Sequence, residues 1–230
     1  MLPEKEYLKN FIELQKYTVD ATNKLIKWIS PGQSEKEVAD KYNSILLEMG
    51  FSEHWYPILV CANETTGMPM SRRIHLPSNE IYIKENGIVS IDCTPMKGTV
   101  WTNWSDTVVI GKNSFFENLI NDTKDIVEKI SINTKEKFKT IGELYNFSCN
   151  LVKNKKIEIL DVNKDVGHSI FQVPKGQTVE ETPMQDRLLI NNQFAKQNLL
   201  GIISIEPQLG RVNPEDNKMY GAKIQKVLFF

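Results

Sequence analysis

The sequence predicts an α+β fold built from two similar halves. Helical periodicity, two capping boxes and short β-branched runs support this prediction. The order helix, helix, strands occurs twice along the 230 residues. The chain has no stretch rich in Gly, Ser or Pro that would separate two domains. We therefore expect one domain, residues 1–230, with internal pseudosymmetry.

The first half begins with two expected helices. Apolar residues recur at helical spacing over residues 4–29, and Pro31 and Gly32 then interrupt the helix. Ser34 and Glu37 have the spacing of a capping box, which predicts a second helix that closes at Gly50. β-branched and aromatic runs then predict strands over residues 56–60, 88–92 and 108–110.

The second half repeats this order. Residues 115–130 return to helical spacing, and a second capping box, Thr140 to Glu143, precedes an expected helix over residues 144–152. Residues 171–193 are polar and irregular. Strands are expected over residues 157–160, 202–205 and 224–229.

Composition excludes several classes of partner. The net charge is −1 and the pI about 6.3, so no global field favours nucleic acid or an anionic membrane. No apolar stretch approaches the ~20 residues of a membrane-spanning helix, and residues 1–6 do not have the pattern of a secretory signal. Cys61, Cys93 and Cys149 are odd in number and lack CxxC spacing, which indicates buried thiols. We expect a cytoplasmic protein.

Four short motifs follow one another along the chain: residues 30–39 (SPGQSEKEVA), 88–92 (IVSID), 167–170 (GHSI) and 204–207 (SIEP). Together they resemble the superfamily of methionine aminopeptidase, the proline-specific aminopeptidases and creatinase. The resemblance covers nearly the whole chain. It implies the pita-bread fold, an α+β fold with pseudo-twofold symmetry and a curved antiparallel sheet flanked by helices.

The active peptidases of this superfamily hold two divalent metals with two Asp, one His and two Glu. Carboxylates supply the charge that keeps two dications close together, and the metals acidify a bridging water. The resemblance assigns Asp92 to the first aspartate, His168 to the histidine and Glu206 to the first glutamate.

The other two ligand positions carry amides. The spacing from Asp92, together with Thr107 and Gly111, places Asn103 at the second aspartate position. Asp106 remains the alternative, although it requires a three-residue shift. Gln225 stands where the closing strand of the family has its bridging glutamate.

The resemblance also implies two further histidines and a substrate pocket. His75 takes one histidine position after a one-residue slip, and Glu180 replaces the other if residues 171–179 contain an insertion. Asn103 and Gln225 become expected substrate-binding groups, because an amide donates and accepts hydrogen bonds. Trp101 is expected either to line the pocket or to pack in the sheet.

The two amides halve the negative charge of the ligand set, leaving only Asp92 and Glu206 as carboxylates. Two dications would then repel each other without compensation. We therefore expect no metal, or one divalent ion held by Asp92, His168 and Glu206. Creatinase has this fold and works without metal, which implies acid/base roles for His168 or His75, with Asp92, Glu180 and Glu206 orienting them.

Three functional hypotheses follow. The first is an enzyme that acts on a small amide- or C–N-containing, amino-acid-like substrate, metal-free or with one metal. The second is a metal-dependent aminopeptidase or proline-type peptidase, with Asp106 restoring one carboxylate. The third is a non-catalytic homologue that binds a peptide or protein. Creatinase-like relatives carry an additional N-terminal domain, so we expect the pocket of this chain to be completed by a second subunit in a homodimer.

Overall fold

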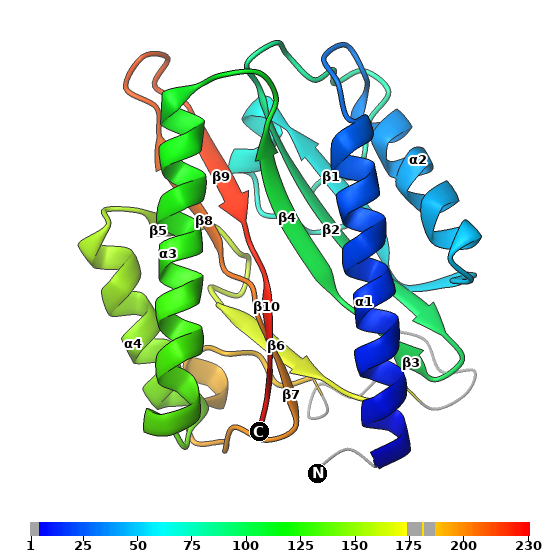
Figure 1. Ribbon diagram of the computed structural model, residues 1–230. Helices are drawn as coiled ribbons and strands as arrows, with labels where there is room; N and C mark the ends of the chain where they lie inside the picture. The colour runs from blue at the N-terminus through cyan, green and yellow to red at the C-terminus, as the bar shows by residue number, and fades with distance from the viewer. Residues whose placement is uncertain (1–4, 174–180, 182–186) are drawn as a thin grey trace.

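The computed structural model describes residues 5–173, 181 and 187–230. Within this part of the chain, four α-helices pack on antiparallel strands (Figure 1). The helices are α1 (Lys5–Trp28), α2 (Glu35–Glu48), α3 (Ser114–Lys137) and α4 (Ile141–Asn154). The strands are β1 (Glu53–Ala62), β2 (Ile88–Lys97), β3 (Val100–Trp101), β4 (Trp104–Val109), β5 (Glu158–Ile159), β6 (Gly167–Ile170), β7 (Ile202–Ile205), β8 (Gln208–Val212), β9 (Met219–Lys223) and β10 (Lys226–Phe229). Two 3₁₀ helices are η1 (Asn63–Gly67) and η3 (Asn192–Phe194).

The strands form three hydrogen-bonded groups. The first has β2 at its centre, paired with β1, β4 and the short β3. The second has the order β10-β7-β6 and the third the order β5-β8-β9. The paired strands in these three groups of the described chain are all antiparallel. The predicted α+β class with antiparallel sheet is therefore confirmed.

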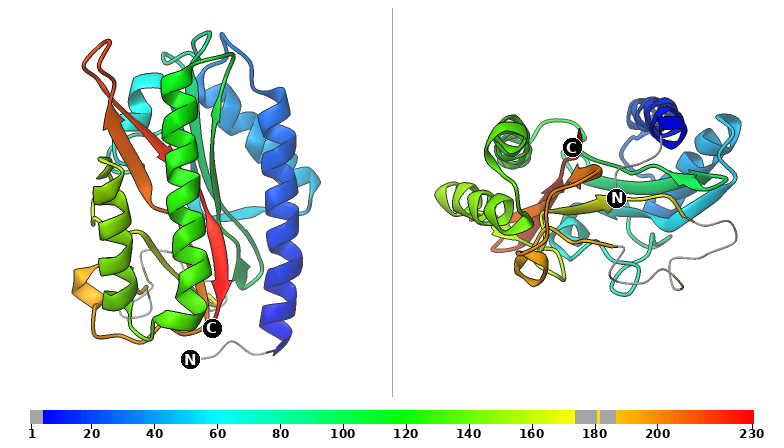
Figure 2. Two further views of the ribbon diagram at one scale, coloured as in Figure 1. Left: turned by 60° about the vertical axis from the view of Figure 1, so that its left-hand side comes forward. Right: turned by 90° about the horizontal axis from the view of Figure 1, so that it is seen from below.

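The long helices cover the strands in pairs. Figures 1 and 2 show α1 with α2 beside the β1–β2–β4 group, and α3 with α4 beside the strands of the second half. Each pair closes its own apolar core: Phe11, Leu25 and Leu46 are buried in the first, and Leu119 and Ile130 in the second. No helix of the described chain is both long and apolar enough to span a membrane.

The sequence-based boundaries are close for most elements. Both capping boxes form, with Ser34 and Thr140 as N-caps. Gly50, with φ 86°, directly follows α2, where a left-handed residue is favoured. The expected strand 224–229 is wrong in one respect. The chain leaves β9 at Lys223 and starts β10 at Lys226, because these two strands pair with different neighbours.

Glu35, the second residue of the capping box, ties the first half together. Its side chain is completely buried. It accepts hydrogen bonds from Ala62 N at 2.8 Å, Thr65 Oγ1 at 2.6 Å and Ser78 N at 3.2 Å, and it pairs with His75 Nε2 at 2.6 Å. One carboxylate therefore fixes the start of α2 against the end of β1 and the loop that carries His75.

Replacement of Glu35 tests this role. Glu35→Ala leaves several buried donors without an acceptor, and each such loss costs about 1–3 kcal/mol. We expect the free energy of unfolding to fall by about 2–4 kcal/mol in urea denaturation. Glu37→Ala, which removes only the exposed capping-box glutamate, is the matched control. A loss as small in Glu35→Ala as in the control would contradict this account.

Candidate active site

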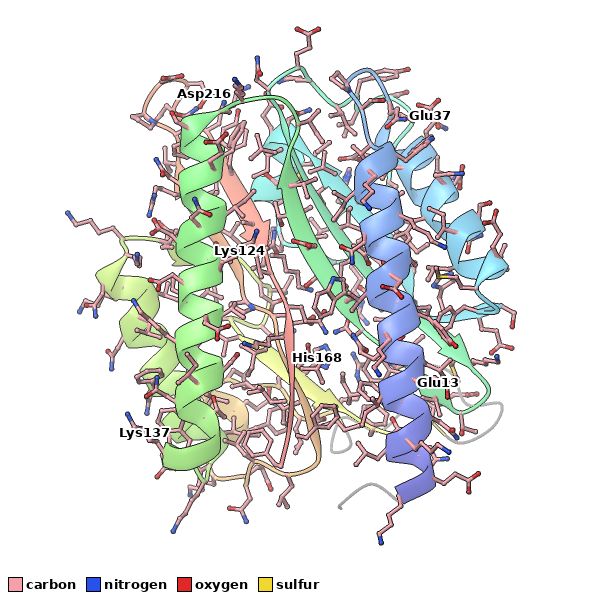
Figure 3. The ribbon with its side chains drawn as sticks, in the orientation of Figure 1. Glu13, Glu37, Lys124, Lys137, His168 and Asp216 are labelled. Carbon is pink, nitrogen blue, oxygen red and sulfur yellow. The ribbon has the colours of Figure 1, made fainter. Side chains whose placement is uncertain are left out.

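The site forms where strands of both halves meet. Asp92 lies on β2 and Asn103 between β3 and β4, whereas His168 lies on β6, Glu206 just after β7 and Gln225 between β9 and β10. Figure 3 shows His168 in the middle of the molecule, between the two long helices. The antiparallel pairing of β6 with β7 brings His168 opposite Ser204, two residues before Glu206.

Glu206, His168 and Asn103 contact one another directly. His168 Nε2 lies 2.9 Å from Glu206 Oε1, and Asn103 Nδ2 donates to Glu206 Oε2 at 2.8 Å. The Asn103 amide nitrogen is also 3.1 Å from His168 Nε2. The second ring nitrogen of His168, Nδ1, lies 2.9 Å from the carbonyl oxygen of Ser169. Three of the five family ligand positions thus form one hydrogen-bonded group.

Lys223 completes this group of side chains. Its contact with them is not predicted from the sequence. Its ammonium forms an ion pair with Asp92 and lies 3.5 Å from Glu206 Oε1. Lys223 is two residues before Gln225, so an extended backbone would turn both side chains to one face. The signal that could have found it is this spacing.

The charges of the site support each other. Although burial opposes ionisation, Lys223 and His168 lower the pKa of Glu206 to about 2. Burial also opposes the charge of Lys223, but Asp92 and Glu206 raise its pKa above its ordinary value. His168 follows the same pattern, since Glu206 and the Ser169 carbonyl outweigh burial and raise its pKa. The site therefore holds its carboxylate, ammonium and imidazole in mutual electrostatic contact.

Asn103 is fixed by its backbone as well. Its carbonyl oxygen accepts from Gln225 Nε2 at 2.6 Å and from Gln15 Nε2 at 2.7 Å. The side-chain nitrogens of Asn103 and Gln225 therefore both donate hydrogen bonds. Their side-chain oxygens, Asn103 Oδ1 and Gln225 Oε1, are buried without a hydrogen-bond partner in the described chain.

Asp106 lies on the other face of β4. Ser105 is the cross-strand partner of Asp92, so these two residues share a face, and Asp106 alternates to the opposite one. Burial raises the pKa of Asp106, whereas the Thr107 backbone N–H and the charge of Lys124 on α3 act to lower it. The structure thus brings Asn103, and not Asp106, to His168 and Glu206.

Trp101 packs against the site histidine. Its ring stacks on His168 with centroids 5.9 Å apart and on Trp55 with centroids 5.7 Å apart. Its Nε1 donates to the carbonyl oxygen of Phe171 at 2.7 Å. Trp101 is almost completely buried, so it supports the imidazole ring from one side.

Two predicted site residues, His75 and Glu180, are not among these contacts. The His75 side chain pairs with Glu35, and within the described residues it forms no hydrogen bond with Asp92, His168 or Glu206. Its part in the site stays a prediction. Glu180 lies outside the described residues.

The donor set fits poorly with the metal centre that the family pattern implies. Within the described chain, no group of three or more His, Cys, Asp and Glu side chains is arranged to hold a metal ion. Asn103 turns a hydrogen-bond donor toward Glu206, and Lys223 directs its ammonium at Asp92. A metal ligand must instead offer a lone pair, so these contacts compete with coordination.

Gly167 lets β6 approach β7 next to His168. It has φ 147°, and a Cβ at this position would lie 1.9 Å from the carbonyl oxygen of Ser204. Only glycine fits there, because the obstacle is backbone. The glycine of the Gly-His-Ser motif thus sets the distance between the histidine strand and the glutamate strand.

Gly167→Ala should therefore disturb the site and the fold together. We expect a loss of about 2–4 kcal/mol in the free energy of unfolding, since strands β6 and β7 must separate. Gly98→Ala is the control: Gly98 also has positive φ, at 64°, but no atom lies within 4 Å of the added methyl group. Equal losses in the two variants, measured by urea denaturation, would show that backbone strain alone acts.

Solved structures share this fold. Prolidase from Pyrococcus furiosus superposes with a TM-score of 0.77 at 18% identity, over 100% of this chain and 62% of that one. X-Pro aminopeptidase from Thermotoga maritima gives 0.73 at 14% identity, over 99% of this chain and 59% of that one. Methionine aminopeptidase from Thermotoga maritima gives 0.73 at 17% identity, over 100% of this chain and 95% of that one.

The chain thus spans about three-fifths of the prolidase and the X-Pro aminopeptidase and nearly all of the methionine aminopeptidase. These likenesses confirm the expected pita-bread fold. No curated protein matches the sequence. The model of metallopeptidase family M24 matches residues 9–228, almost the whole chain. The protein therefore belongs to metallopeptidase family M24.

Proposed function

We propose that the protein is a divergent member of its family that acts on a small amide- or C–N-containing, amino-acid-like substrate without a pair of metal ions. The observation that carries this proposal is the His168–Glu206 pair, 2.9 Å apart and linked to Asn103. The pair combines a proton carrier with a buried carboxylate that steadies its charge.

The pair can serve both proton transfers of a hydrolysis. In this scheme the oxygen of a water molecule bonds to the acyl carbon and the C–N bond breaks. The departing nitrogen takes a proton from the His168–Glu206 pair, and a proton of the water returns to the pair. Glu206 orients the imidazole and stabilises it in its charged form. His168 retains 23% of its side-chain exposure, against 6% for Glu206, so it faces the ligand side.

Asn103 Oδ1 and Gln225 Oε1 are proposed to receive the N–H groups of the substrate. Both oxygens are buried, and neither has a partner in the described chain. A buried acceptor without a partner costs about 1–3 kcal/mol, which a ligand donor can recover. This favours substrates with an ammonium, amide or amidine group over those that carry only acceptors.

Arg72 and Arg187 are proposed to bind the acidic end of an amino-acid-like substrate. The guanidinium of Arg72 stacks over the Tyr56 ring at 5.2 Å. Burial lowers the pKa of Arg187, and the like charge of Arg72 adds to this shift. Guanidinium groups match carboxylates in shape and charge, which is the reason for this assignment.

Two alternatives stay in view. A non-catalytic homologue that binds a peptide or protein is favoured by the closed hydrogen bonding of Asn103, His168 and Glu206. A metal-dependent aminopeptidase, or an enzyme with one divalent ion on Asp92, His168 and Glu206, is favoured by the family itself. A homodimer that completes the pocket, the single domain 1–230 and a cytoplasmic location remain part of the proposal.

Turnover without metal is the decisive experiment. Chelator-treated protein is assayed against dipeptides, amino-acid amides, N-substituted amino acids and amidines. We expect chelator-resistant turnover, and a His168→Gln variant should lower kcat by about 10²–10⁴-fold, the usual contribution of a general acid or base.

His54→Gln is the matched control, because His54 is paired with Asn43 at 2.9 Å and contacts none of the site side chains in the described chain. Full activity in His168→Gln would overturn the assignment. Turnover that appears only after divalent metal is added would establish a metal-dependent enzyme instead. Tight binding of the panel with no turnover would establish the non-catalytic homologue.

A further inference from the structure

Lys223 is the only lysine in the buried interior of the described chain. Lys84, Lys129 and Lys226 also form ion pairs, but their side chains are 42–59% exposed, whereas that of Lys223 is 11% exposed. Removing an ammonium from water is costly unless carboxylates surround it. Its position therefore needs an explanation in the site itself.

The explanation lies in the two carboxylates of the family's ligand set. The Lys223 ammonium pairs with Asp92 and lies 3.5 Å from Glu206 Oε1, so it is in reach of both. They are the two carboxylates left in that set, since the two remaining carboxylate positions carry Asn103 and Gln225. One protein cation thus faces the negative charge that would attract divalent ions.

The backbone holds Lys223 in place. Its N–H donates to Thr107 Oγ1 at 2.8 Å, and the same hydroxyl donates to the Lys223 carbonyl oxygen at 3.0 Å. Thr107 lies on β4, two positions from Ser105, the cross-strand partner of Asp92. The lysine therefore enters the site from a strand that is fixed to the sheet carrying Asp92.

We propose that the Lys223 ammonium is the resident cation of this site and takes the electrostatic place of the divalent ions. It offsets the negative charge of Asp92 and Glu206 in the interior and repels an incoming dication at the same position. The inference concerns the same side chains as the proposed function and rests on that assignment of the site. It predicts a property, metal affinity, that can be measured without any turnover.

Removal of the ammonium should open the site to metal. Lys223→Met leaves Asp92, Glu206 and His168, three ligands of the kinds that hold a single Co²⁺ or Zn²⁺. We expect the purified wild-type protein to bind Co²⁺ weakly in equilibrium dialysis, and Lys223→Met to bind it at least roughly tenfold more tightly. Its Tm should be low in chelator and rise when Co²⁺ is added, whereas that of the wild type should not move.

A second variant avoids the risk that Lys223→Met fails to fold. Asn103→Asp with Gln225→Glu keeps Lys223 and adds two carboxylates of nearly unchanged shape. We expect this double variant to gain metal binding as well, because four carboxylates then outweigh the combined positive charge of Lys223 and a protonated His168.

Lys226→Met is the control for loss of a lysine nearby, since Lys226 pairs with the exposed Glu128 on the surface. It should bind Co²⁺ as weakly as the wild type. Stoichiometric, tight binding of Co²⁺ by the wild type, or equal affinity in the wild type and Lys223→Met, would overturn the inference. Neither result would touch the acid/base role of His168, which is tested by turnover, so the two proposals fail separately.

Discussion

The compensation of charge in the interior is the constraint on which this site depends. Asp92 and Glu206 come from strands in different halves of the molecule, and neither carboxylate reaches bulk water freely. Lys223 and His168 supply the opposite charge, and Asn103 adds a neutral donor. Because each group is stabilised by the others, the site behaves as one electrostatic unit.

The fold could be predicted well from the sequence, because the strongest signals are local. The capping boxes at Ser34 and Thr140 and the apolar spacing place α1, α2 and α4 to within a few residues, whereas α3 continues to Lys137, seven residues beyond its predicted end. The strands were harder. β6 and β8 contain Gly167 and Gly210, so they lack the β-branched pattern of a typical strand, and tertiary contacts decide their conformation.

The site could be predicted in part. Asp92, His168, Glu206, Asn103 and Gln225 are predicted because each occupies a position in a recognisable motif. The structure joins these five residues in one chain of contacts, in which Lys223 links Asp92 to Glu206. Lys223 was missed because a lysine carries no sign of burial in its sequence: most lysines are solvated. Its spacing from Gln225 is a weak signal, and the ion pairs with Asp92 and Glu206 show its position.

The change of pairing partner between β9 and β10 affects how the candidate site assembles during folding. Gln225 sits in the short connection where the chain leaves one strand group for another, and it holds the carbonyl oxygen of Asn103 from the first half. Neither half therefore contains all the residues of the candidate site. An intermediate with one half ordered would possess a core but no chemistry, and ligand binding should report the docking of the halves rather than the formation of either.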